Sequence, residues 1–226
     1  MSAATNPLPA TGGLDAETLE SVRRLAPQAF RAVQYRAVLP ADYEAAAETL
    51  PWVQRAGTVF RWTGSWLTVF TTPDPLHGQP ITIDQRTALI ALLNRYRMAG
   101  YESYVPDPKY VSLDVVVEVC ALPSAFRGDV EAALLTALGS GPGGFFDPDH
   151  FTFGQALQLS DLEAAAQRAY GVAGVTCVRY RVRGRTRGFV RMGDTVSVGV
   201  DEIIRCDNDP SLPEHGSLQV IIQGGK

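Results

Sequence analysis

The side chains most able to bind a metal or move a proton lie in turn segments of this chain. Two Asp-x-Asp pairs, Asp147/Asp149 and Asp207/Asp209, lie beside prolines but lack the further spaced oxygens of a calcium-binding loop. No two histidines have the spacing that places both imidazoles on one helix face, so a zinc site would need distant loops to converge. We therefore expect these aspartates to bond their own backbone, and we expect no metal site. The three histidines are His77, His150 and His215.

Two further patterns suggest chemistry but lack the context that it needs. Residues 139–144 spell G-x-G-x-x-G, which binds a dinucleotide when a strand precedes it and a helix follows. Here a helical pattern precedes the segment and Pro142 interrupts it, so we expect a loop and no cofactor. The tripeptide Arg127-Gly128-Asp129 fits the start of a helix, where an acidic side chain favours the positive helix end.

A catalytic nucleophile has little support in the sequence. The pattern G-x-S-x-G is absent, and no cysteine has a local partner signature. A catalytic triad can be assembled from a serine, a histidine and an aspartate that are far apart in the sequence, and it is recognised only in a three-dimensional structure. A hydrolase is therefore kept as an alternative. We predict that the protein is not an enzyme and has no catalytic residues. The cysteines are odd in number and indicate packed thiols in a reducing cytoplasm; they are Cys120, Cys177 and Cys206.

The most concentrated charge in the chain is a run of arginines with no acid among them. Strand alternation places several of them on one face of a hairpin that turns near Gly184. They could form a solvated face, contact acidic patches on neighbouring subunits, or bind a ligand or nucleic acid. The net charge of −4 disfavours nucleic acid. The run comprises six arginines in thirteen residues: Arg179, Arg181, Arg183, Arg185, Arg187 and Arg191.

A second unusual segment, residues 144–155, is both irregular and aromatic. Pro148 prevents a regular element from passing through it. Exposed rings would cost solubility, so we expect a structured loop whose rings dock on their own domain or on a neighbouring subunit. This composition favours assembly over catalysis, and the four rings join the arginines as candidate subunit contacts: Phe145, Phe146, Phe151 and Phe153.

The elements that hold these groups alternate between helices and strands in both halves of the chain. Prolines 106 and 108 mark a boundary, and residues 1–13 have the composition of a disordered segment. We predict an α+β fold of two small modules, residues 14–107 and 108–226, each with helices packed on a mostly antiparallel sheet. Helices are expected at residues 15–27, 40–49, 84–99, 128–138 and 160–170. Strands are expected at residues 52–62, 66–72, 111–120, 174–183, 187–192, 195–205 and 217–223.

Individual residues set several of these boundaries. Pro40 suits the first position of a helix, and Gly100 supplies a left-handed stop. Ser160 and Glu163 have the spacing of a capping box, which predicts that a helix begins there. Over residues 111–120 aliphatic residues alternate with a second set that is mostly polar, which predicts a strand with one buried face.

Composition excludes several classes of protein. Hydrophobic content of 46% and charged content of 19% are ordinary for a globular protein, and the pI near 5.4 gives no attraction for anionic membranes. The first thirteen residues lack the basic start and apolar run of a signal peptide, and no apolar run approaches the roughly 20 residues needed to span a bilayer. We expect a soluble, cytoplasmic protein.

Short segments spread over residues 14–226 resemble the baseplate J-like family of contractile phage tails and related injection systems, in the same order. The resemblance covers the later portion of family members, which are usually longer on the N-terminal side. Each motif is weak by itself, and their order makes the set specific. The segments are Ala26–Arg31, Arg36–Val38, Asp42-Tyr43, Val53–Ala56, Tyr96–Gly100, Gly144–Leu162, Asp207–Leu218 and Gly224-Gly225.

The resemblance implies a structural baseplate wedge component. Such a protein would be incorporated into an assembled injection particle as a homo- and hetero-oligomer. Its partners would be other wedge proteins, the tube or hub, and components near the sheath, with no membrane and no nucleic acid expected. On this view the four phenylalanines and six arginines listed above contact neighbouring subunits.

Overall fold

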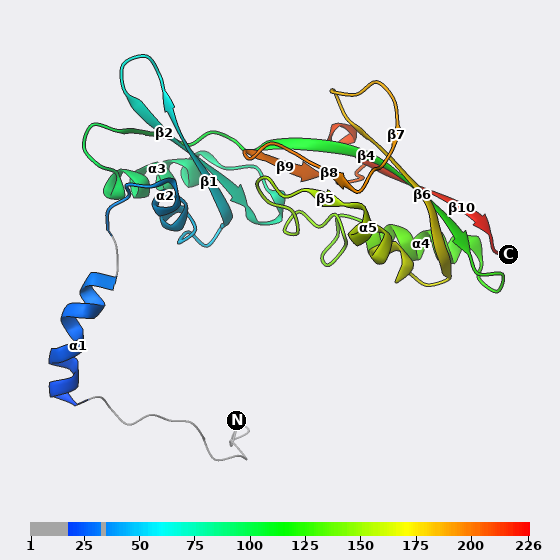
Figure 1. The fold of residues 1–226 in the computed structure, drawn as a ribbon, viewed down its shortest axis with the longest axis horizontal. Coiled ribbons are helices and arrows are strands. Elements are labelled where there is room, and N and C mark those ends of the chain that lie inside the picture. Colours follow the sequence, from blue (N-terminus) through cyan, green and yellow to red (C-terminus); the bar gives the residue numbers. More distant parts are fainter. Residues whose placement is uncertain (1–17, 33–34) are drawn as a thin grey trace, which may run out of the picture. The chain divides into compact units, whose positions relative to one another are not determined.

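The structure is a computed structural model that describes residues 18–32 and 35–226 (Figure 1). The predicted disordered segment at residues 1–13 lies outside them. The chain divides into two units, residues 1–35 and 36–226. In the first unit α1 (Leu19–Ala32) passes through Pro27, so the expected helix end at that proline is wrong. A proline inside a helix removes one hydrogen bond and crowds the carbonyl four residues before it, so it destabilises or kinks the helix without always ending it.

The second unit begins with a three-stranded sheet covered by two helices. Its elements are α2 (Pro40–Ala47), β1 (Val53–Trp62), β2 (Leu67–Pro75), a short 3-10 turn η1 (Leu76–Gly78), α3 (Ile83–Tyr96) and β3 (Glu102–Tyr104). The strand order is β1-β2-β3, with β1 and β2 antiparallel and β3 parallel to β2. The predicted hairpin is confirmed, whereas β3 was not expected. The core of this part includes Tyr43, Val69, Leu89 and Leu93.

Local chemistry explains the helix ends in this region. Pro40 opens α2, as predicted, and the Asp42 carboxylate accepts the N–H groups of Val38 and Leu39 at 2.8 Å each. The predicted helix at 84–99 ends early, at Tyr96, because the Tyr96 carbonyl accepts the N–H of Ala37 at 2.7 Å and the chain then extends. The Gly100 stop is therefore not the helix end.

A larger, five-stranded sheet follows, with β4 (Lys109–Ala121) at its centre. The strand order is β10-β4-β6-β7, and β9 also pairs with β4. β9 and β10 run parallel to β4, along its first and second halves respectively, while β6 is antiparallel. The remaining elements are α4 (Arg127–Leu138), β5 (Leu157–Gln158), α5 (Leu159–Gln167), β6 (Val172–Val182), β7 (Val190–Arg191), β8 (Thr195–Val196), β9 (Glu202–Arg205), the 3-10 turn η2 (Pro213–His215) and β10 (Ser217–Gly224).

Three sequence-based boundaries in this half are wrong. The expected strand at 195–205 is split into β8 and β9, and the expected strand at 187–192 shortens to β7. The predicted capping box does not form, because α5 begins at Leu159 and Ser160 lies inside its first turn. The N–H of Leu159 donates instead to the Asp194 carbonyl at 2.9 Å, so a distant segment anchors this helix start.

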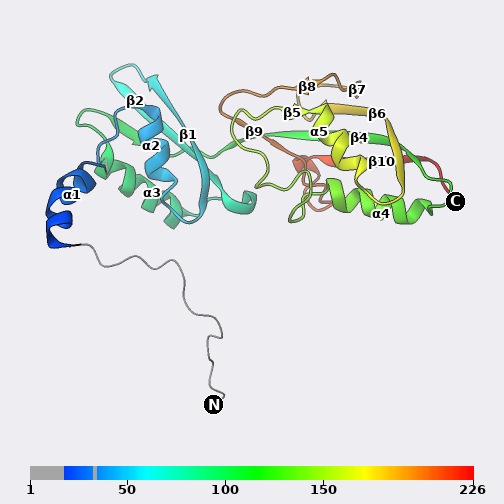
Figure 2. The ribbon, with the colours of Figure 1, turned by 60° about the horizontal axis from the view of Figure 1, so that its bottom comes forward.

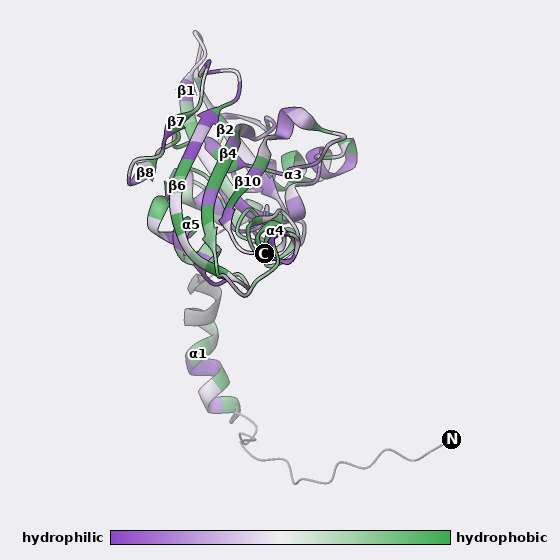
Figure 3. Cartoon of the chain, turned by 90° about the vertical axis from the view of Figure 1, so that its right-hand side faces the viewer, coloured by the Kyte–Doolittle hydropathy of each residue, from purple (hydrophilic) through white to green (hydrophobic). Residues whose placement is uncertain are grey.

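Alternation along β4 separates a helix-covered face from an open face. Leu113, Val115, Val117 and Val119 are buried in the core, as predicted, but Asp114 and Val116 on the other face are buried as well. Figures 1 and 2 show α4 and α5 on the same face of this sheet. In Figure 3 hydrophobic residues concentrate along β4, beside a hydrophilic stretch of β6. The helix stripe packed against this face consists of Val130, Leu134 and Leu138 from α4 with Leu162 and Ala166 from α5.

The α+β fold class is confirmed. One hydrophobic cluster contains residues up to Val105, and the other begins at Val111. This separation supports the module boundary expected near residue 107, which we keep as a proposal. Among the described residues no helix is long and apolar enough to cross a bilayer.

Candidate interaction surfaces

The aromatic loop packs mainly on this chain's own core. Phe145, Phe146 and Phe151 are buried and contact one another, with Phe145 and Phe146 edge to face at 5.1 Å between ring centroids. Backbone bonds fix the loop to the end of α4: the N–H of Phe145 donates to Ala137 and that of Phe146 to Gly139. Rings that are buried in the monomer have little further surface to offer a partner, so among these residues the proposed subunit contact is favoured for Phe153, which is only partly buried.

The glycine-rich segment at 139–144 is part of this packing and lacks the strand-turn-helix context of a dinucleotide-binding loop. It follows α4 directly as a turn, as predicted, so the element just before it is a helix and not a strand. A Cβ atom at Gly144 would lie 2.1 Å from the Gly139 carbonyl oxygen, so the turn requires glycine at this position. The tight turn brings the chain back toward the core, where Phe145 and Phe146 enter it.

Four of the six arginines on the predicted hairpin bind acids of the same chain. β6 and β7 form the hairpin, and Gly184 follows β6 with a positive φ of 77°. Arg179 pairs with Glu118 at 2.6 Å, and Arg185 pairs with Glu202. Arg181 and Arg183 both bind Asp114, each at 2.6 Å. The expected contact with acids is therefore made within the chain, across the open face of the sheet.

Asp114 is the centre of this network. It lies on β4 with 0% of its side chain exposed, and it also accepts a hydrogen bond from the Ser217 hydroxyl at 2.7 Å. Burial alone would raise the pKa of this carboxyl, but the bonds from Arg183, Ser217 and Arg181 outweigh it and hold the pKa below its usual value. A charge buried in this way is stable only while its partners remain.

Arg187 and Arg191 differ from the other four arginines. Both are exposed, and no salt bridge or side-chain hydrogen bond joins either of them to the described part of the chain. A subunit contact through the hairpin stays a prediction for these two residues. They are also the positions where charge can be changed without disturbing the Asp114 network.

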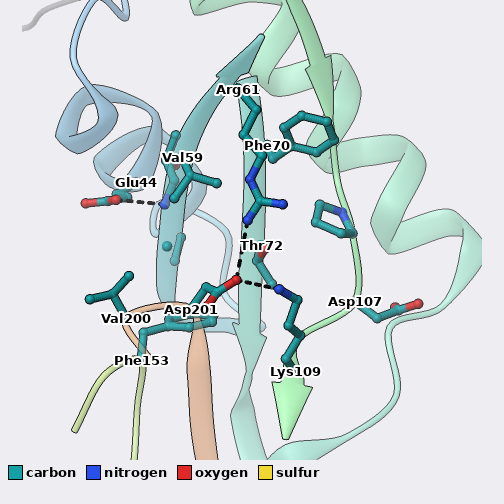
Figure 4. Close-up of a pocket in the computed structure, with 14 residues that line it drawn as sticks. Glu44, Val59, Arg61, Phe70, Thr72, Asp107, Lys109, Phe153, Val200 and Asp201 are labelled. Atoms are coloured by element: carbon teal, nitrogen blue, oxygen red, sulfur yellow. Dashed lines mark hydrogen bonds and ion pairs between the residues drawn. The ribbon is translucent and has the colours of Figure 1, made fainter. Parts of the chain in front are cut away.

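A cleft of about 490 Å³ lies between the β1–β2 hairpin, the start of β4 and the loop before β9 (Figure 4). Lys109 and Arg61 converge on one oxygen of Asp201, at 2.5 Å and 3.4 Å. The Lys109 bond, with a contribution from Arg61, holds the pKa of Asp201 below its usual value, so the carboxylate stays ionised at neutral pH. Asp201 therefore acts as the acidic member of an ion pair at the rim of the cleft, and not as a proton donor.

The floor and rim of this cleft combine apolar and polar groups. Phe153 lies in close contact with Gly57, where an added Cβ would sit 3.3 Å from the ring. Val200 is 81% exposed at the rim. An apolar floor with a charged rim is the composition of a protein interface. The cleft thus joins Phe153 to groups that sequence reasoning missed, since Lys109 and Asp201 are 92 residues apart.

Two of the four turn aspartates, Asp147 and Asp209, bond nearby backbone as predicted, whereas Asp207 binds the His215 imidazole at 2.7 Å. Asp147 accepts the N–H of Asp149 at 3.1 Å, and Asp209 accepts that of Ser211 at 2.8 Å. Asp149 also binds the His77 imidazole at 2.7 Å. Within residues 18–32 and 35–226 no group of three or more His, Cys, Asp or Glu side chains could hold a metal ion.

The three cysteines are free, and only one of them is packed as expected. Cys206 is buried, and burial raises its pKa to about 12, so its thiol stays protonated and unreactive. Cys120 is exposed and Cys177 is intermediate, which contradicts the expectation of packed thiols at these positions.

Asp74 is the most perturbed acid in the described chain. It lies at the end of β2, 2% exposed, and its Oδ2 has no hydrogen-bond partner. Burial raises the pKa of Asp74 to about 7, and the nearby Asp149 carboxylate adds to the rise. This carboxyl is therefore a local source of instability wherever it is ionised.

Replacing Asp74 by Asn will change the pH dependence of stability. A folded pKa near 7 against an ordinary value of 3.8 means that the folded state holds the proton more tightly, so the wild-type contribution is full below about pH 4 and is lost as the pH rises through 7. We expect the variant to match the wild type at pH 4 and to exceed it at pH 8 by about 1–3 kcal/mol. Urea unfolding across this range measures the difference, and an equal gap at both pH values would contradict it.

The part of the chain that contains the first sheet matches a known protein family. Residues 35–105 match the family model described as Baseplate J-like central domain, a range that spans α2 to β3. The resemblance to the baseplate J-like family is thus confirmed through this part of the chain. A search of curated proteins gives no match.

A solved structure gives a second comparison. The cryo-EM structure of the anti-feeding prophage (AFP) baseplate, 6-fold symmetrised, matches with a TM-score of 0.47 and 18% sequence identity. The match covers 88% of this chain and 43% of that chain, so our chain spans less than half the length of that baseplate protein.

Proposed function

We propose that this protein is a structural baseplate component of a contractile injection particle, and that it acts in the wedge. The observation that carries the proposal is the Baseplate J-like central domain at residues 35–105. The partners proposed are other wedge proteins, the tube or hub, and components near the sheath. The protein would work by contacts between subunits and would make or break no covalent bonds.

Two surfaces of the chain support a role in assembly. The cleft beside Phe153 has an apolar floor and a rim formed by Val200 and the Lys109–Asp201 ion pair. The hairpin presents Arg187 and Arg191 to solvent, where the forked guanidinium suits a carboxylate on a neighbour. Permanent assemblies of this kind need interfaces on the order of 2,000 Å² or more, so both surfaces would be used together with others.

Size-exclusion chromatography with light scattering tests the proposal, using the chain alone and mixed with the products of neighbouring genes. We expect the isolated chain to be monomeric or weakly associating and to enter a discrete hetero-complex with them. A chain that ignores those partners and turns over a substrate would overturn the proposal.

Charge reversal on the hairpin tests the arginine surface. The double variant Arg187→Glu/Arg191→Glu should fold normally, because neither side chain has a partner in the described chain, and should weaken the hetero-complex at least tenfold, a loss of about 1.4 kcal/mol. Arg95→Glu, at an exposed position on α3, is the matched control and should leave the complex unchanged. Equal binding by both variants would assign the hairpin to a solvated face.

A further inference from the structure

The outer edge of β10 is an open strand edge with no charged residue on it. β10 pairs with β4 in eight consecutive registers, from Ser217 with Asp114 to Gly224 with Ala121, without a bulge. No strand of the described chain lies on its other side. A regular, uncharged and β-prone edge attracts a further strand unless the protein blocks it.

Three other strands of the described chain have edges that are occupied, short or irregular. On β1, carboxylates from α2 and its C-cap residue occupy outer N–H groups: Glu44 accepts that of Thr58 at 2.8 Å, and Glu48 accepts that of Ala56 at 3.3 Å. β3 is only three residues long. β6 carries two register shifts opposite residues 118–121, which twist that edge away from regular pairing. Compared with these three edges, the edge of β10 is long and regular.

Hydrogen bonds at both ends of β10 define the open segment. The N–H of Leu218 donates to the Asn208 side chain at 2.9 Å, and the carbonyl of Gly224 accepts from Arg127 at 2.7 Å. In a β-strand the backbone N–H and C=O groups of successive residues point alternately to the two neighbouring sides. The N–H and C=O groups of Val220 and Ile222 therefore point away from β4, as the N–H of Leu218 does. No other hydrogen bond from the described chain reaches these two residues outside the sheet. The free groups lie between the two capped ends, symmetric about Ile221.

Side chains along this edge are symmetric about the same residue. Gln219 and Gln223 flank Ile221 on the open face, and Val220 and Ile222 pack toward the core. Ile221 itself is 41% exposed. If a second β10 ran antiparallel with Ile221 opposite Ile221, glutamine would face glutamine and each β-branched residue would face another. The capped N–H of Leu218 would also lie opposite the capped carbonyl of Gly224.

We infer that β10 pairs antiparallel with β10 of a second copy of this chain, about a two-fold axis at Ile221. An interface of this kind uses the same surface on both subunits. A single strand pair is smaller than the roughly 1,200–2,000 Å² of a stable interface, so we expect a weak dimer that forms at high protein concentration. The inference rests on the sheet edge and does not depend on the proposed baseplate role.

Cysteine cross-linking tests the register directly. Ile221→Cys, made together with Cys120→Ser to remove the exposed native thiol, should give a disulfide-linked dimer on mild oxidation. Directly opposed residues without mutual backbone bonds bring their Cβ atoms within about 4.5–5.5 Å, close to disulfide geometry. Gln219→Cys in the same background is the control. Its two copies would lie four residues out of register, about 13 Å apart, and should stay monomeric.

Sedimentation of the unmodified chain gives the second measurement. The wild type should show a concentration-dependent dimer, and Ile221→Lys should lose it, since like charges placed opposite one another disfavour strand pairing. Equal cross-linking of the two cysteine variants would overturn the inference. A wild type that stays monomeric at all concentrations would also overturn it. If, in addition, Ile221→Lys blocked binding to neighbouring gene products, the edge of β10 would be assigned to a different chain.

Discussion

Replacing Arg181 and Arg183 together by methionine will destabilise the protein by about 3–5 kcal/mol. The reason is that Asp114 has no exposed surface and depends on these two guanidinium groups for its charge balance. Removing them leaves a buried carboxylate with only the Ser217 hydroxyl as a partner. Urea unfolding at pH 7 measures the loss, and Arg187→Met/Arg191→Met, which removes two exposed arginines of the same hairpin, should stay within about 0.5 kcal/mol of the wild type.

A third variant separates charge balance from simple loss of packing. Adding Asp114→Leu to the two methionine substitutions removes the whole ionic group, and stability should return to near the wild-type value. The pH dependence follows from the lowered pKa of Asp114: its contribution is present above the ordinary value of 3.8 and is lost as the pH falls through the lower folded value. If the double methionine variant were as stable as the wild type at pH 7, Asp114 would not depend on this pair.

Phe146→Ala will lower the free energy of unfolding by about 3–5 kcal/mol, because the ring is 2% exposed and the substitution opens a cavity among Phe145, Phe151 and the core. Phe153→Ala is the matched variant from the same loop. Its ring is only partly buried, so we expect a smaller loss of stability and a larger effect on binding to neighbouring subunits. Thermal or urea unfolding together with the light-scattering assay distinguishes the two effects.

The opposite result for this pair would restore the original interpretation of the loop. If Phe146→Ala left stability unchanged and abolished the hetero-complex, its ring would be serving a neighbour rather than this chain. The structure favours the first outcome, since a ring that is already buried in the monomer has little further surface to lose on assembly.

Much of the secondary structure could be predicted because its signals are local. The β1–β2 hairpin follows from two strand-forming runs separated by a glycine turn, and the stripe on α4 follows from helical spacing. Two of the errors occur where distant backbone intervenes. The Asp194 carbonyl accepts the N–H of Leu159, and α5 begins before the predicted cap. The N–H of Ala37 donates to the Tyr96 carbonyl, and α3 ends before Gly100.

The candidate surfaces were harder to predict than the fold. Arginine spacing on β6 was visible in the sequence, but nothing local showed that four of these side chains meet acids of the same chain. Asp114 stands in an apolar strand 69 residues before Arg183, and their contact depends on the register of β4 with β6. A one-residue change of that register would turn these side chains to the opposite face.

The sequence by itself determined the α+β class, the positions of most elements, the turn roles of Asp147 and Asp209 and the resemblance to baseplate J-like proteins, because each depends on residues that are near neighbours in the chain. Only the tertiary structure decided that the phenylalanine rings fill this chain's own core, that Asp114 holds two arginines, and that β10 has a regular open edge. These features arise from strand order and register, which bring together residues far apart in the sequence, and no local pattern encodes that pairing.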